Sequence, residues 1–523
     1  MGARGVIKRA LSRARGLFGG LTDRQYAAAK SDRLTGEWRP INSGINELLK
    51  SSRPAILART RQLIRDFGYL GRAKRVIVNY RVGDGIILQS RVREELPDGQ
   101  FRLDQTAIQR IEDCWLRWTE DCDAGGRMHY HDIERLWAGE DVEAGESIVA
   151  LRWDTTNGRY LPLTLQVYEA EWLSDMPATR IQPGAVFDQG VEMDAATLRP
   201  IAYHFAVPQG YGGFEPIRDA GARLSRVPAD LVLHGFEPIR AGQVRGISPF
   251  ASAILLADDL QDCVDSTVAR FKMASRWLAF IQTESPMDWQ RDRARADGQD
   301  GRRTVDMQNA ILEFLKPGES VNINNADIPG GSFDPFVAFI LRTLAVCADV
   351  PYELLSGEYG GLNYSTMRVL RSDFNKLRRP GTKRHIRQFS VPCFRAMLYA
   401  AHLAGRLDLP GFWENPARYQ ECIWQEPGQD PLDLLRESRA YVELANNRHW
   451  SPQETILARG RNPEDVLDEC EEWEAELKRR GLTVIPTSSA AQTNPAAVME
   501  TTTTGMASKK LAEDPDYDME ARN

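Results

Sequence analysis

The sequence predicts an α+β fold divided among two to four structural units. The chain has 523 residues, more than one hydrophobic core normally serves. Strand-type alternation dominates between about residues 50 and 247, and long helical patterns follow from residue 248 onward. Hydrophobic residues make up 42% and charged residues 27% of the chain, which is the balance of a folded globular protein.

Residues 1–45 are predicted to form a basic N-terminal arm. Its cations are Arg4, Lys8, Arg9, Arg13 and Arg15. Two interpretations stay open: a segment attracted to phosphate groups, or an amphipathic helix on a neighbouring subunit, because Val6, Ala10 and Leu17 recur near helical spacing. The apolar stretch that follows the cations is too short for a secretory signal before polar residues resume at Thr22, so we expect none.

Residues 46–247 are predicted to form an α+β domain. Apolar residues from Ala55 to Phe67 keep helical spacing and predict a helix that Gly68 ends. Two-residue alternation over 147–153 and 161–172 predicts half-buried strands. The segment 190–205 predicts a hairpin with an irregular connection.

Residues 248–282 are predicted to hold one long helix that runs from Pro249 to about Ile281. It would reach on the order of 45 to 50 Å. Its apolar stripe contains Leu260, Val264, Val268 and Phe271. The aspartates expected on the opposite side are Asp258, Asp262 and Asp265. This acidic face is either a solvated surface or a functional one, and both interpretations stay open.

A polar excursion over 283–332 is predicted to lead into a second helix over 333–350. That helix should end where Val350 precedes Pro351, since a residue before proline avoids the α region. A glycine-rich loop over 351–364 follows. Its candidate functional residues are Glu358, Tyr359, Gly360, Gly361, Asn363 and Tyr364.

Residues 365–405 are predicted to form a basic helix with Ser365 as its N-cap and a break or kink at Pro380-Gly381. Its candidate cationic residues are Arg368, Arg371, Lys376, Arg378 and Arg379. One interpretation is a solvated face that pairs with acidic residues such as those from Glu464 to Glu476. The other places positive charge near a nucleic-acid path.

The remaining chain is predicted to be helical over 406–482 and disordered over 483–523, where threonine, serine, alanine and proline are frequent.

A net charge of −7 argues against a broad basic surface that coats nucleic acid, so any DNA contact should be local. No apolar run approaches the roughly 20 residues that span a bilayer. Seven scattered cysteines indicate reduced thiols of a protein made in cytoplasm.

No pattern supports catalysis, and we expect no cofactor and no metal. The chain has no Gly-Lys pair, so the lysine of a phosphate-binding P-loop is absent, and neither GxSxG nor HExxH occurs. Cys114 and Cys122 are too far apart, and His129 and His131 too close, for paired zinc ligands. We expect Cys114 to be a buried core residue and the two histidines to lie in a surface strand or turn.

Collinear motifs over about residues 45 to 480 resemble the portal proteins of the lambda type, from tailed double-stranded DNA phages and prophages. Matching stretches include Gly145-Glu146, Gly190-Val191-Glu192-Met193 and Arg199-Pro200-Ile201-Ala202-Tyr203-His204-Phe205. More specific are Arg226-Val227-Pro228-Ala229, Gly242-Gln243-Val244-Arg245-Gly246-Ile247-Ser248-Pro249 and Pro351-Tyr352-Glu353-Leu354-Leu355-Ser356-Gly357 with Asn363-Tyr364-Ser365. Their shared order carries the resemblance.

The resemblance implies a portal fold and a homo-dodecameric ring. In that fold 46–247 would be a wing, 248–282 and 333–350 stem helices, 283–332 a clip, 351–364 a tunnel loop, 365–405 a basic wing helix, and 406–482 a helical crown. It also implies a location at the portal vertex of the virion. The expected partners are double-stranded DNA, the terminase large subunit, head-completion or tail adaptor proteins and the major capsid protein, with no membrane.

We expect a non-enzymatic conduit in which Asp258, Asp262 and Asp265 face the channel and the tunnel loop approaches DNA. Acidic walls suit a channel because each gripped phosphate would have to be released at every step of sliding. Two alternatives stay open at this point: another head-tail connector or scaffold protein without a DNA channel, and a nucleic-acid enzyme.

Overall fold

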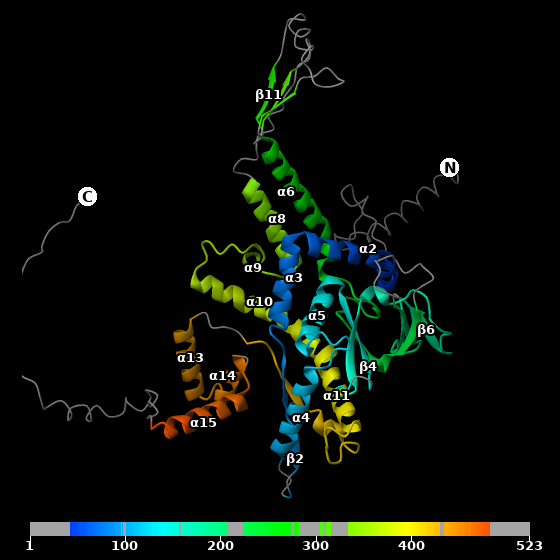
Figure 1. The fold of residues 1–523 in the computed structure, drawn as a ribbon, viewed down its shortest axis with the longest axis vertical. Helices are drawn as coiled ribbons and strands as arrows, with labels where there is room; N and C mark the ends of the chain where they lie inside the picture. Colours follow the sequence, from blue (N-terminus) through cyan, green and yellow to red (C-terminus); the bar gives the residue numbers. More distant parts are fainter. Residues whose placement is uncertain are drawn as a thin grey trace, which may run out of the picture. The chain divides into compact units, whose positions relative to one another are not determined.

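Figure 1 shows a computed structural model of the chain, which forms two compact units, Met1–Pro427 and Gly428–Asn523. The structure describes residues 42–95, 97, 101–155, 158–207, 223–274, 277–281, 304–307, 310–314, 333–428, 433–459 and 461–481. The predicted N-terminal arm up to residue 41, most of 283–332 and the tail from residue 482 lie outside these residues.

Two consecutive helices open the first unit: α2 (Ile45–Asp66) and α3 (Gly68–Arg81). The predicted end of the first helix at Gly68 is wrong, since Gly68 is the first residue of α3. Phe67 makes the break instead: it is extended, with φ −107° and ψ 107°, and its ring is buried in the core. Its N–H still donates to the Leu63 carbonyl at 2.8 Å.

Two antiparallel sheets form the middle of this unit. The first has the order β10-β4-β5, with β10 (Val232–Phe236), β4 (Glu146–Trp153) and β5 (Leu163–Tyr168). The second has the order β6-β7-β8-β9, with β6 (Ala185–Asp188), β7 (Val191–Asp194), β8 (Pro200–Val207) and β9 (Arg223–Pro228). The predicted hairpin over 190–205 is confirmed as β7–β8. Short 3₁₀ turns η2 (Ala170–Trp172) and η3 (Ala229–Leu231) follow β5 and β9.

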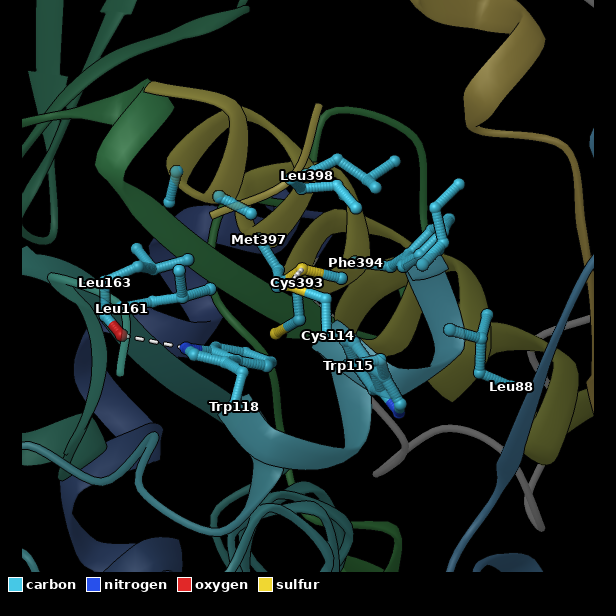
Figure 2. Close-up of a cluster of buried hydrophobic side chains, with 14 of the residues drawn as sticks. Leu88, Cys114, Trp115, Trp118, Leu161, Leu163, Cys393, Phe394, Met397 and Leu398 are labelled. Carbon is cyan, nitrogen blue, oxygen red and sulfur yellow. Dashed lines mark hydrogen bonds between the residues drawn. The ribbon is translucent and has the colours of Figure 1, made fainter. Parts of the chain in front are cut away.

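The largest core joins segments that are far apart in the chain. It packs α4 (Gln105–Thr119) and α5 (Tyr130–Glu143) against α11 (Val391–Leu403) and the β4–β5 strands. Figure 2 shows Cys114 and Trp115 among Cys393, Phe394 and Met397. The indole N–H of Trp118 donates to the Leu163 carbonyl at 2.9 Å. The prediction that Cys114 is a buried core residue is confirmed.

Residues 406–427 belong to the first unit, and they include a strand, so the prediction of helices alone over 406–482 is wrong for this stretch. Leu407, Phe412 and Tyr419 are buried in the largest core, and β14 (Cys422–Gln425) pairs antiparallel with β1 (Ile87–Ser90). A short helix α12 (Pro416–Tyr419) precedes β14, and the β2 (Arg93–Glu95) and β3 (Phe101–Leu103) ribbon follows β1. These apolar residues therefore keep 406–427 in the first unit.

The predicted helix from Pro249 to Ile281 is shorter in the structure. It begins with a 3₁₀ turn η4 (Pro249–Ser252), and α6 runs over Ile254–Ala274, a length of about 31 Å. The segment β11 (Trp277–Ile281) is a strand that pairs parallel with β13 (Ala310–Phe314), which also pairs antiparallel with β12 (Thr304–Met307). Its aromatic and branched residues suit a strand.

A second core forms where α6 meets α8 (Phe333–Cys347), α2 and α3. Leu260 of α6 and Leu344 of α8 are both buried there. The helix predicted over 333–350 is confirmed, although it ends three residues earlier than expected. Asp349 has a positive φ of 51°, which no α-helical residue adopts, so the helical path ends ahead of Pro351.

The predicted break at Pro380-Gly381 is absent from the helix that follows the loop. Helix α10 (Tyr364–His385) passes through Pro380, continues as one π-helical turn η5 (Ile386–Ser390), and leads directly into α11. Proline removes one backbone hydrogen bond. Contacts with α3 hold the helix on both sides of it: the Phe374 ring lies 4.7 Å from that of Tyr80, and the Thr382 hydroxyl donates to the Arg81 carbonyl.

The described part of the second unit contains three helices, α13 (Leu434–Asn446), α14 (Pro452–Ala458) and α15 (Pro463–Arg479). Each begins with a side-chain cap: Asp433, Ser451 and Asn462 accept from backbone N–H groups of the first turn. Helical structure was predicted for this stretch and is confirmed.

Candidate functional site

The acidic face of α6 lies where the sequence predicted it. Ile254, Ala257 and Leu260 are buried in the second core. Asp258, Asp262 and Asp265 are exposed on the opposite side of the helix, together with Asp259. Three carboxylates at positions 258, 262 and 265 form a negative stripe along two turns. Such a stripe repels phosphate groups.

A buried charge cluster fixes the start of this helix to the sheet domain. The carboxylate of Glu146, at the start of β4, is fully buried and accepts from the Arg245 guanidinium, from Arg53 and from the Gly246 N–H. His234 Nε2 lies 3.2 Å from its second oxygen. Burial would raise the pKa of Glu146, but Arg245, Arg53 and His234 hold it well below its ordinary value. The carboxylate is therefore ionised.

Arg245 also connects this cluster to backbone carbonyl groups. Its guanidinium also donates to the carbonyl oxygens of Gln189 at 2.7 Å and Ala170 at 2.8 Å. Two glycines allow the backbone segments around residues 145 and 246 to lie in direct contact. A Cβ on Gly145 would lie 1.9 Å from the Ile247 carbonyl carbon, and one on Gly246 would lie 2.0 Å from the Gly145 oxygen. The two motifs Gly145-Glu146 and Arg245-Gly246 are thus one contact.

Ser248 completes the anchor directly before the helix. Its hydroxyl donates to the Val142 carbonyl of α5 at 2.8 Å and accepts from the Phe250 N–H at 3.1 Å. Sequence reasoning singled out both motifs but not their meeting. A glycine next to a charged residue in each motif was the available signal, because a buried charge needs a partner and glycine permits close packing.

The loop predicted over 351–364 is shorter, because Tyr352–Ser356 form the one-turn helix α9. Gly357 ends α9 with a positive φ of 78°. The Tyr352 hydroxyl donates to Glu358 at 2.7 Å, and this bond raises the pKa of Tyr352. Arg72 donates to the Leu354 carbonyl at 2.6 Å. The base of the loop is therefore held, and Tyr359 at its tip is exposed.

Asn363, rather than Ser365, caps helix α10. Its side-chain oxygen accepts from the Thr366 N–H at 2.8 Å and from the Thr366 hydroxyl at 2.9 Å. The predicted cap at Ser365 is wrong because the helix already begins at Tyr364. Gly360 and Gly361 are exposed, and Gly361 has a positive φ of 80°.

The cations of α10 divide into packed and exposed groups. Arg378 donates to the Tyr80 carbonyl at 2.6 Å, and Arg384 pairs with Asp141 and Glu237. Arg368, Lys376 and Arg379 are exposed and Arg371 is half-buried. Lys376 lies 3.4 Å from Asp373, and Arg379 lies 3.8 Å from Glu426. Exposed pairs of this kind are weak, so the outer face of α10 stays positive.

His129 lies in the turn before α5, where the sequence predicted it, and serves as the N-cap of that helix. His131 was expected in the same turn but lies in the first turn of α5. His204 is fully buried between the Glu192 carboxylate and the Ala178 N–H.

Among the residues that the structure describes, no group of three or more His, Cys, Asp or Glu side chains could hold a metal ion. Across the same residues, no helix is long and apolar enough to cross a bilayer.

Comparison with known proteins identifies relatives along most of the chain. It is 23% identical to portal protein B of Escherichia phage lambda over 87% of this chain and 89% of that protein. It is 23% identical to a probable portal protein of Halomonas phage phiHAP-1, over 88% of each chain. A chain in the neck of a native gene transfer agent particle covers 82% of this one at 14% identity, with a TM-score of 0.37.

The family model of the lambda family of phage portal proteins matches residues 31–379, about two thirds of the chain. The matched range includes the Glu146–Arg245 cluster, the acidic face of α6 and the loop before α10. The chain therefore belongs to the lambda family of phage portal proteins, which are non-enzymatic structural proteins of the virion and connect its head to its tail.

Proposed function

We propose that twelve copies of this chain form a ring at one capsid vertex, through which the double-stranded DNA genome is packaged and later ejected. The observation that carries this proposal is the exposed acidic stripe of α6, Asp258, Asp262 and Asp265, on a helix whose other side is anchored in the core. The ring first docks the terminase large subunit and later the head-completion or tail adaptor proteins. It sits in a shell of major capsid protein.

The acidic stripe lines the channel of this ring. Repeated around a closed ring, its carboxylates repel the DNA backbone from every side and keep the duplex centred. Carboxylates along the wall make no phosphate contacts that would have to break at each step. The net charge of −7 is compatible with this role.

The loop over 357–363 approaches the DNA. Its two ends are fixed, because Gly357 closes α9 and Asn363 caps α10. Between them the exposed Tyr359, Gly360 and Gly361 can move without disturbing either helix. The exposed cations of α10 add local positive charge near the DNA path. This charge attracts the DNA phosphates at long range.

The proposed ring also assigns a role to each of the other regions of the chain. The sheet domain is the wing, to which 406–427 also contribute, and α6 with α8 forms the stem. Residues 283–332 form the clip that docks terminase and tail proteins. Helices α13 to α15 form the crown.

A charge reversal tests the channel role. The triple variant Asp258→Lys, Asp262→Lys, Asp265→Lys changes only exposed side chains, so the rings should still assemble. New cations in the channel would grip phosphates, and DNA packaging in vitro should slow by at least about tenfold and recover partly as salt is raised.

The matched control carries the same three reversals at exposed aspartates elsewhere, Asp175, Asp230 and Asp408. This variant should package DNA at the wild-type rate. Equal packaging by the two triple variants would contradict a channel position for the α6 stripe.

A further inference from the structure

The loop between α9 and α10 begins at a residue that α9 holds twice. The Tyr352 hydroxyl, at the start of α9, donates to the Glu358 carboxylate at 2.7 Å, and the Glu358 N–H donates to the Ser356 hydroxyl oxygen at 3.1 Å. Gly357 makes this return possible, because its positive φ of 78° turns the chain back at the end of α9. Both the backbone and the side chain of Glu358 are therefore attached to α9.

Tyr352 is itself held by helix α8. Its ring is half-buried and packs against the second core, and the Arg342 guanidinium of α8 lies over it, 5.2 Å from the ring centre. A guanidinium over an aromatic face is attracted to it. Figure 1 shows α9 beside α8 and α3, at the base of the loop. A line of contacts thus runs from Arg342 through Tyr352 to Glu358.

The chemistry of the Tyr352–Glu358 bond suits a contact that can open. A hydroxyl bound to a carboxylate makes a stronger hydrogen bond than two neutral groups do, and this bond raises the pKa of Tyr352. Arg342 and Ser356 are the other groups that act on the phenol. Glu358 is exposed, so water competes for the same carboxylate. The bond can therefore favour one position of the loop without locking it.

The position of Glu358 determines where the tip of the loop begins. Tyr359 directly follows Glu358 and is exposed. At the far end of the loop the Asn363 cap fixes the chain to α10 alone. The contact of Glu358 with Tyr352 is thus the side-chain bond through which α8 and α9 can act on the tip.

We infer that Tyr352 is a positioning residue, whose hydroxyl latches the loop to α8 through Glu358 and so sets how far Tyr359 reaches toward DNA. The reach toward DNA rests on the proposed function of the loop. The latch itself needs no DNA, so it can be measured separately.

Chymotrypsin cleavage after Tyr359, in the full-length assembled protein without DNA, tests the latch. The variant Tyr352→Phe keeps the ring under Arg342 and removes only the hydroxyl. Cleavage should become roughly three- to tenfold faster, because a protease cuts the opened loop and one hydrogen bond no longer opposes opening. Mass spectrometry identifies the cut.

Variants of Glu358 show whether the hydrogen bond is responsible. Glu358→Ala should accelerate cleavage as much as Tyr352→Phe does, and the double variant should be no faster than either, because both changes remove the same contact. Glu358→Gln should stay within about twofold of the wild-type rate, since its amide oxygen can still accept from the phenol.

The matched control is Tyr69→Phe, which removes the hydroxyl of another half-buried tyrosine that packs against the second core. Its cleavage rate should equal that of the wild-type chain. Three results would overturn the latch: a wild-type rate in Tyr352→Phe, equal rates in Glu358→Gln and Glu358→Ala, or a double variant that multiplies the two single effects.

Nuclease-protected DNA in heads assembled with Tyr352→Phe separates this inference from the proposed function. A looser loop should retain less DNA. Faster cleavage with normal DNA retention would overturn the positioning toward DNA and count against the loop's proposed role, while the latch would stand. Unchanged cleavage would remove the latch and leave the proposed DNA conduit intact.

Discussion

At the scale of single residues, the Glu146 carboxylate is held by four partners in the buried part of the first unit. Arg245 and Arg53 balance its charge, and the Gly246 N–H and His234 complete its contacts. A buried pair of this kind adds little net stability compared with apolar residues, but removing one partner leaves an uncompensated charge. Glu146 therefore holds the start of α6 in one position relative to the sheet.

Replacing Glu146 with Gln should destabilise the sheet domain by about 3–5 kcal/mol near neutral pH, because two buried guanidinium groups lose their counter-charge. Hydrogen exchange of β4 amides in the full chain measures the change. The control Glu120→Gln alters a highly exposed glutamate, which should leave the exchange unchanged. Wild-type exchange rates in the variant would contradict the role of the cluster.

The same residue predicts a pH dependence in the wild-type chain. The pKa of Glu146 is lowered in the folded state, so its contribution is complete above the ordinary value of about 4.5 and is lost as pH falls through the lowered pKa. Protection of β4 should decrease in that acidic range, and the Glu146→Gln variant should lack this part of the decrease.

At the scale of elements, sequence periodicity predicted the helices and strands better than their ends. The β7–β8 hairpin and the acidic face of α6 follow directly from alternation and helical spacing. The end of α6 does not, because 277–281 keep an apolar pattern that suits a helix as well as the strand β11. Pairing with β13, distant in sequence, decides the outcome.

Tertiary contacts also override two local signals. Pro380 stays inside α10 because Phe374 and Thr382 pack on α3, and Gly68 starts a helix because Phe67 takes the extended conformation. Local rules for proline and glycine describe isolated chains, whereas packing on a neighbouring helix supplies the missing stabilisation.

Deleting residues 358–362 should leave rings intact but impair DNA packaging or retention. The deletion spares the Gly357 end of α9 and the Asn363 cap of α10, so both helices keep their ends. The measurement is the amount of nuclease-protected DNA in assembled heads. The single change Glu120→Gln, at an exposed glutamate outside the loop, is the control. Normal packaging by the deletion variant would argue against the loop's role.

At the scale of the whole molecule, the order of motifs predicted the portal family, which the comparisons show. Contacts between distant segments could not be predicted. Periodicity describes neighbours in sequence, so it could not reveal that α4 packs against α11 or that β14 pairs with β1 and keeps 406–427 in the first unit.

A reconstruction of the assembled protein by electron cryomicroscopy tests the central proposal most directly. The account predicts a ring of twelve copies with a central channel, in which Asp258, Asp262 and Asp265 of every copy face the lumen. Particles without a central hole, or a ring in which these carboxylates are buried between subunits or face outward, would contradict it.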